Sequence, residues 1–124
     1  MEALHVLEYD EPTIKRFIVC MKTLIMKFGG AALETPKHFS NVAEIISARQ
    51  KEYERIVVVV SAMWGVTDEL TALAHQVVKK PAPREMDMLV SAGERISMAL
   101  LAMALSESGV DAVSLTGSQS GIIT

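Results

Sequence analysis

The chain has 124 residues, which is room for one domain, and half of them are hydrophobic, so a core can be buried. The formal net charge is −3 and no stretch is strongly basic, which argues against a nucleic-acid partner. Cys20 is the single cysteine, so an intrachain disulfide is excluded and a reducing, cytoplasmic location is expected.

The sequence does not show the usual features of a membrane or secreted protein. Its uninterrupted apolar runs, such as residues 56–60 and 98–105, are far shorter than the ~20 residues that a membrane-spanning helix needs. Acidic side chains at positions 2, 8, 10 and 11 stand where a signal peptide would be basic and then apolar. We therefore expect no membrane partner.

Residues 1–20 differ from the rest of the chain, because they mix charged residues with isolated apolar ones and contain Pro12. A more regular pattern starts at Met21. We expect an N-terminal extension over residues 1–20 and a domain over residues 21–124. The alternative is that residues 1–20 add a strand or a helix at the edge of that domain.

The first part of the domain indicates a strand, a helix and a second strand. Residues 23–28 predict a buried strand that ends at the pair Gly29-Gly30. Thr35 and Pro36 are typical of an N-cap followed by proline at the first helical position. Residues 56–60 predict a central parallel strand buried on both faces. The helix between the strands would present one apolar face, made of Phe39, Val42, Ala43 and Ile46.

The second part indicates two helices, a strand and a loop. We expect one helix to begin at Thr67 and a second, longer helix over residues 85–108 that ends at Gly109. A third strand over 112–115 and a polar loop over 116–121 would follow. Each helix would have one face toward the core. In the first helix that face is made of Leu70, Leu73, Ala74 and Val77. In the second it is made of Met86, Leu89, Val90, Gly93, Ser97, Leu100, Leu101 and Ala104. This order predicts an α/β fold with a mainly parallel sheet flanked by helices.

Three polar segments follow the expected strands: residues 27–30, 61–67 and 116–121. Ligands of open α/β sheets bind beyond the carboxyl ends of the strands, so we expect these segments to meet there. Lys27 would neutralise the charge of a transferred group, and the following glycines would let backbone N–H groups approach phosphate oxygens. The alternative is a solvated lysine at a strand end before a plain Gly-Gly turn. The spacing of a P-loop is absent.

Ser61 and Thr67 carry hydroxyls that could bind a carboxylate or a phosphate near a helix N-terminus. For Thr67, the residues alone favour the alternative of a simple N-cap. Glu94, within an apolar helix, could bind the α-ammonium group of an amino acid. Its alternatives are an ion pair with Arg84 or Arg95, or plain solvation.

Trp64 lies in the turn after the second strand, where it could pack over a ligand or cap the core. Residues 86–103 are rich in methionine at helical spacing, which is typical of core packing.

Taken together, the polar segments resemble those of the aspartokinases. Lys27-Phe28-Gly29-Gly30 resembles the KFGG signature that opens this family. Residues 57–63 with 67–70 (VVVVSAM, TDEL) are similar to its second segment, and 84–89 with 93–97 (REMDML, GERIS) to its third. Residues 116–121 (TGSQSG) are similar to its fourth segment. The four segments stand in the same order as in the family, and the resemblance covers residues 21–124.

The resemblance implies the N-terminal half of an amino-acid kinase fold. It implies phosphoryl transfer from ATP to the side-chain carboxylate of L-aspartate, giving 4-phospho-L-aspartate, the first step of lysine, threonine and methionine biosynthesis. Lys27 would be catalytic and would bind ATP with Phe28, Gly29, Gly30 and Ser61. Aspartate would be held by Thr67 and Glu94. Mg²⁺ would bridge the ATP phosphates without a ligand from this chain.

Two departures from the family pattern stand out. Ala31-Ala32 occupies positions where aspartokinases usually carry hydroxyl residues. The chain also stops after the fourth segment, so we expect a truncated domain with little activity alone. A homodimer or a separate C-terminal half would be its partner. The alternative function is a non-catalytic lobe that pairs with a full-length or separately encoded partner.

Overall fold

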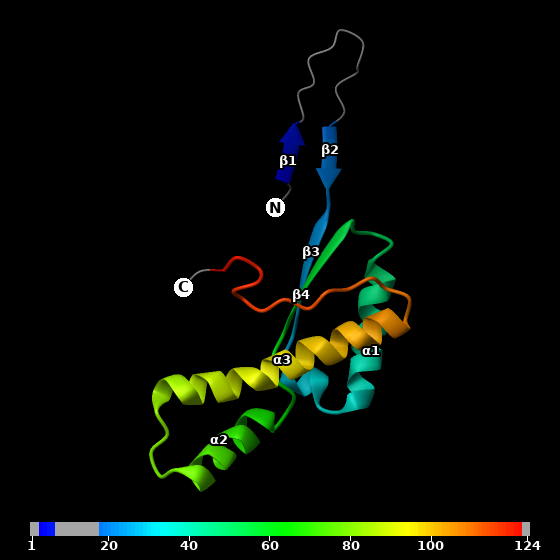
Figure 1. The fold of residues 1–124 in the computed structure, drawn as a ribbon. Helices are drawn as coiled ribbons and strands as arrows, with labels where there is room; N and C mark the ends of the chain where they lie inside the picture. Colours follow the sequence, from blue (N-terminus) through cyan, green and yellow to red (C-terminus); the bar gives the residue numbers. More distant parts are fainter. Residues whose placement is uncertain (1–2, 7–17, 123–124) are drawn as a thin grey trace.

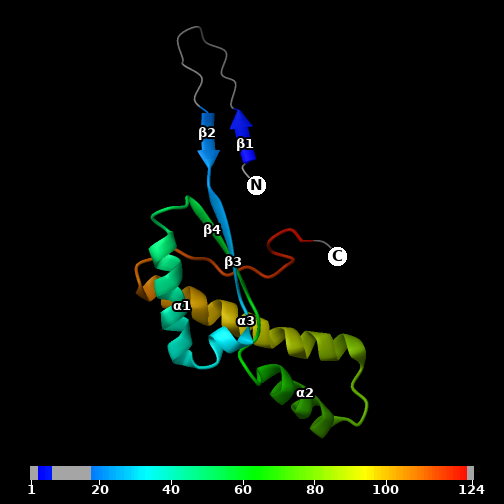
Figure 2. The same ribbon diagram turned by 180° about the vertical axis from the view of Figure 1, so that it is seen from behind.

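Parallel strands with helices packed on one side form the main body of the chain. The computed structural model describes residues 3–6 and 18–122, and Figures 1 and 2 show them from opposite sides. The elements in chain order are β1 (Ala3–Val6), β2 (Ile18–Met21), β3 (Thr23–Phe28), the 3₁₀ turn η1 (Gly30–Leu33), α1 (Pro36–Arg49), β4 (Arg55–Val60), α2 (Val66–Val77) and α3 (Pro83–Glu107). The predicted α/β class with parallel strands flanked by helices is confirmed.

The strands β3 and β4 pair in parallel, with Thr23 opposite Arg55 and Phe28 opposite Val60. Side chains alternate between the two faces of this ribbon, as the pleat of a strand requires. One face packs against the core, and the other exposes Ile25, Val57 and Val59. The prediction that both strands are buried was therefore wrong for this second face. In the described residues, α1 and α3 cover only the first face.

The helix α1 begins and packs as its sequence predicts. Thr35 is its N-cap and Pro36 its first residue, and its buried residues are Phe39, Val42, Ala43 and Ile46. His38 adds an unpredicted contact, because its Nδ1 accepts a hydrogen bond from the backbone N–H of Thr35 at 3.2 Å and lies within hydrogen-bonding distance of the Thr35 hydroxyl, at 2.8 Å. This reciprocal capping satisfies an N–H group that a helix start otherwise leaves without a partner.

The helix α3 contacts both α1 and α2 and is the longest element of the fold. It buries Gly93, Ser97, Leu101 and Leu105, close to the predicted inner face. Its end is a Schellman motif, in which Gly109 has φ +74° and the N–H of Val110 donates to the Leu105 carbonyl at 2.9 Å. The predicted stop at Gly109 is confirmed, and it turns Val110 into the core.

By length and composition, α3 is also apolar enough to cross a membrane. Its longest uninterrupted apolar run is nevertheless short, residues 98–105, because Glu94, Arg95 and Ser97 interrupt the helix. Core helices of folded domains share the same composition. Here α3 packs on α1 and α2, and 22% of its most apolar stretch is buried.

The helix α2 is less buried than its pattern predicts. Among the residues expected to face inward, Leu70 and Ala74 are half-buried, but Leu73 and Val77 are exposed. The reason is that α2 packs mainly against α3, which leaves its other apolar positions uncovered in the described residues.

The predicted third strand, 112–115, is extended chain rather than a strand. A strand requires backbone hydrogen bonds to a neighbour, and the backbone bonds of the described residues include none from 111–115. A cavity separates this segment from β4 instead. The segment is extended, but the hydrogen-bonded ladder that would make it a strand is not formed.

The strands β1 and β2 pair antiparallel in a sheet of their own. The prediction for residues 1–20 falls partly on 1–2 and 7–17, which lie outside the described residues. Within the rest, the alternative of added strands fits β1 and β2, although neither joins the β3–β4 sheet. The division of the chain into an extension at 1–20 and a domain at 21–124 stays a prediction.

Candidate functional site

The Gly-Gly turn after β3 lies directly against the turn after β4. A Cβ atom built on Gly30 would be 3.0 Å from the backbone oxygen of Ala62 and 3.7 Å from the backbone nitrogen of Trp64. Only a residue without a side chain allows two backbones to approach this closely. The parallel pairing of β3 and β4 brings the two turns to the same end of the ribbon.

The helix α3 meets the same point through a second glycine. A Cβ built on Gly93 would be 3.0 Å from the Cβ of Ala62 and 3.2 Å from Cγ1 of Val66. Ala62 therefore lies between Gly30 and Gly93. This contact, which we call the Ala62 junction, joins three of the four segments that the sequence singled out.

Lys27, Phe28 and Gly29 approach the junction along β3. Lys27 is exposed on the open face of the ribbon, whereas Phe28 is half-buried on the core face. Gly29 has open space around it, since no heavy atom lies within 4 Å of a Cβ built there. In the described residues, no hydrogen bond uses the backbone N–H of Gly29, Gly30 or Ala31. Those donors are free to bind an anion.

Ser61 and Thr67 lie at the two ends of the turn that contains Ala62. Ser61 is half-buried, and its N–H donates to the Phe28 carbonyl at 3.2 Å, which ties the two strand ends together. The N-cap of α2 is Gly65, with φ +79°, and the helix starts at Val66. The reading of Thr67 as an N-cap is therefore wrong. Thr67 lies in the first turn of α2 with its side chain exposed.

Glu94 follows Gly93 on α3 and is exposed. The ion pairs of the described residues do not include it, because Arg84 pairs with Glu85 and Arg49 with Glu52. The alternative of an ion pair with Arg84 or Arg95 is therefore not what the structure has. A carboxylate next to the junction stays available for a ligand with a positive charge.

Trp64 was not among the residues assigned to the site, yet it belongs to the turn at the junction. It is 68% exposed, so the more conservative reading, in which it caps the core, is wrong. A tryptophan between Ser61 and Thr67, after a strand, is a signal that the sequence did contain.

The fourth segment, residues 116–121, does not join the others. Its hydrogen bonds stay within the loop, where Gln119 Oε1 accepts from the Thr116 N–H at 2.9 Å and Ser120 Oγ donates to the Gly117 carbonyl at 2.8 Å. Both views place this loop level with the middle of the β3–β4 ribbon rather than at its carboxyl end. The expectation that all these segments meet at one edge was wrong for this loop, because the strand before it is not formed.

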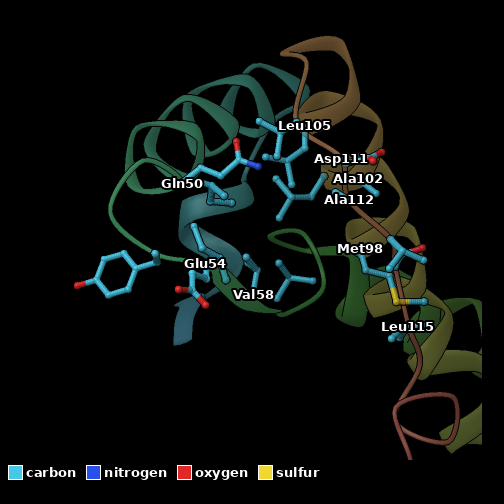
Figure 3. A pocket seen from close by; sticks show the side chains of 17 residues that line it. Gln50, Glu54, Val58, Met98, Ala102, Leu105, Asp111, Ala112 and Leu115 are labelled. Carbon is cyan, nitrogen blue, oxygen red and sulfur yellow. The ribbon is translucent and has the colours of Figure 1, made fainter. Parts of the chain in front are cut away.

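A cavity of about 330 Å³ lies away from the junction, between β4, α3 and residues 110–115 (Figure 3). Most of its lining residues are apolar, including Val58, Met98 and Leu105, but Gln50, Glu54 and Asp111 also line it. None of the predicted site residues lines it. The cavity marks the space left where the segment 112–115 does not pair with β4.

In the described part of the chain, no group of three His, Cys, Asp or Glu side chains could hold a metal ion. A cation bound at the junction would take most of its ligands from another molecule, such as the phosphates of a nucleotide.

The fold and the junction define a class of protein. The sequence model described as "Amino acid kinase family" matches residues 22–123, and the chain belongs to this family. The curated relatives it resembles are aspartokinases. Those of Mycobacterium tuberculosis and Corynebacterium glutamicum are 50% and 51% identical to it over 104 residues. A third, from Pseudomonas aeruginosa, is 45% identical over 104 residues.

These matches cover 84% of this chain but 25% of each relative, so the chain spans about a quarter of the length of the aspartokinases it matches. Among solved structures, the crystal structure of aspartate kinase from Synechocystis is similar, with a TM-score of 0.73 and 44% identity. That match covers 79% of this chain and 17% of the other. The likeness in three dimensions supports the parallel arrangement described above.

Proposed function

We propose that this chain is the acceptor-binding part of an aspartokinase, which transfers a phosphoryl group from ATP to the side-chain carboxylate of L-aspartate. The observation that carries the proposal is the Ala62 junction, where Gly30 and Gly93 bring three polar segments together. About half of the residues are identical to curated aspartokinases over the aligned region, which supports the choice of substrate.

The residues around β3 would act on the phosphate side. Lys27 would stabilise the negative charge of the transferring group, and the free N–H groups of Gly29 and Gly30 would bind its oxygens. Phe28 would hold the turn through its packing on the core, and Ser61 would lie near the phosphates. Phosphoryl transfer needs mainly positioning and electrostatic stabilisation, which fixed backbone donors supply.

The residues around α2 and α3 would act on the amino-acid side. The Thr67 hydroxyl would bind a carboxylate of aspartate near the N-terminus of α2, where the helix dipole favours negative charge. Glu94 would bind the α-ammonium group by an ion pair. The product would be 4-phospho-L-aspartate, made in the cytoplasm for lysine, threonine and methionine biosynthesis.

ATP and Mg²⁺ would be the cofactors, with the metal bridging phosphate oxygens and reducing their charge. The described residues offer free backbone donors for phosphate but no metal-binding cluster, so the metal would depend on the nucleotide. Because the chain spans a quarter of its relatives, we expect it to bind L-aspartate but to turn over little ATP alone.

The test is calorimetric titration with L-aspartate and L-glutamate, together with a coupled ADP-release assay. We expect binding that prefers L-aspartate and no robust turnover. The Glu94→Gln variant should weaken binding about tenfold or more, because a charge-assisted bond contributes about 1.5–3 kcal/mol. Glu107→Gln is the matched control, an exposed glutamate at the far end of the same helix. Equal binding of both amino acids, or an unchanged Glu94→Gln variant, would contradict the assignment.

The exposed apolar side chains of Ile25, Val57 and Val59 favour one alternative, a non-catalytic lobe that pairs with a partner, either a second copy or a separate C-terminal half. Co-expression with the C-terminal remainder of the Corynebacterium glutamicum aspartokinase would test it. Co-purification in a fixed ratio without aspartate-dependent ADP release would support pairing without catalysis. Turnover by the mixture would support the catalytic reading.

A further inference from the structure

Trp64 is the single tryptophan of the chain, and its position has no explanation in the core. An aromatic side chain usually contributes a large buried area to stability, and this one leaves 68% of its surface in water. The turn that carries it is nevertheless fixed, since its backbone lies against Gly30 and the Val66 N–H donates to the Met63 carbonyl at 3.2 Å. A fixed turn thus presents an exposed indole beside the candidate site.

The surroundings of Trp64 indicate the chemistry of a ligand. Two residues before it, Ala62 contacts Gly93, and the next residue of α3 is the exposed Glu94. An aromatic face together with a carboxylate attracts a cation, through the ring quadrupole and by direct ion pairing. The same carboxylate would repel the phosphates of a nucleotide. The ligand group that suits both side chains is an ammonium.

Resting on the proposed function, we propose that Trp64 is a substrate-contact residue that covers the α-ammonium group of the acceptor amino acid together with Glu94. This role goes beyond the residues assigned above, because it makes the turn after β4 a determinant of specificity for amino acids over dicarboxylates. Thr67 then binds the carboxylate end, and Trp64 and Glu94 bind the ammonium end.

The experiment uses tryptophan fluorescence, excited at a wavelength that tyrosine does not absorb, so that the emission reports on Trp64, the single tryptophan of the chain. L-Aspartate should change the emission in a saturable way, and succinate, which has both carboxylates but no ammonium, should not. In calorimetry, Trp64→Ala should weaken L-aspartate binding about three- to tenfold, and Trp64→Phe should recover most of it. The Val77→Ala variant removes another exposed apolar side chain, on α2, and should bind as the unmodified chain does.

The outcomes separate this inference from the proposed function. If L-aspartate binds but leaves the emission and the Trp64→Ala affinity unchanged, the inference is overturned and the proposed function stands. An emission change with succinate or ATP that equals the change with L-aspartate would also overturn it. If calorimetry detects no L-aspartate binding to the unmodified chain, both are overturned. Circular dichroism of each variant confirms that the fold is retained.

Discussion

Gly29 and Gly30 are neighbours in the sequence but have different surroundings. The first is extended, with φ −80°, and has open space where a side chain would be. The second lies against the Ala62 carbonyl. The sequence alone gave both the same role, because a glycine pair indicates a turn without saying which residue the packing requires. The packing requires Gly30 for the junction and leaves Gly29 for a ligand.

A pair of alanine substitutions tests this distinction. Gly30→Ala should lower the free energy of unfolding by about 1–3 kcal/mol, because the new methyl group forces the two turns apart. Gly29→Ala is the matched control and should change it by less than about 1 kcal/mol, since its φ suits alanine. Urea denaturation followed by circular dichroism measures both. Equal losses for the two variants would contradict the packing described.

At the scale of the elements, α3 connects the core to the site. One stretch of its length packs Leu101 and Leu105 against the core, and another places Gly93 on Ala62 and α2. The sequence predicted the apolar spacing and the terminal glycine of α3. It also predicted the N-cap and the buried face of α1. The weaker burial of α2 was not, because a hydrophobic pattern shows which face is apolar but not whether another element covers it.

Two substitutions on α3 measure the contribution of its buried face. Leu101→Ala should destabilise the chain by about 2–4 kcal/mol, because it removes a buried side chain and leaves a cavity. Met103→Ala, two residues on and largely exposed, should cost less than about 0.5 kcal/mol. Thermal and urea unfolding should both show a larger loss of stability for Leu101→Ala than for Met103→Ala. A larger effect at Met103 would indicate that its face of α3 is covered in solution.

For the whole molecule, the sequence predicted the class of fold and the meeting of three of the four site segments correctly, but it also predicted a third strand that is not formed. The run 56–60 and the segment 112–115 both have the composition of strands, yet only the first has a hydrogen-bonded neighbour. A strand depends on its partner, which local sequence does not provide. The same reason explains why the β3–β4 ribbon, expected to be central, has one uncovered face.

That uncovered face should make the isolated chain self-associate. Replacing Ile25 and Val57 together by threonine keeps residues suited to strands while removing exposed apolar surface, so it should reduce association with little loss of stability. Light scattering over a range of concentrations measures the effect. The control variant replaces Met26 and Val58, which pack on the core, by threonine as well. It should lower the stability of the fold instead. Unchanged association of the first variant would contradict the role given to this face.

The central claim is that the Ala62 junction binds the acceptor amino acid. Backbone amide chemical shifts in NMR spectra of the labelled chain, recorded during titration with L-aspartate, test it most directly. We expect saturable shifts at Gly30, across residues 61–67, and at Gly93 and Glu94, with the residues around the cavity beside β4 unaffected. Shifts confined to the residues that line that cavity, such as Ile56, Leu105 and Val110, would contradict it.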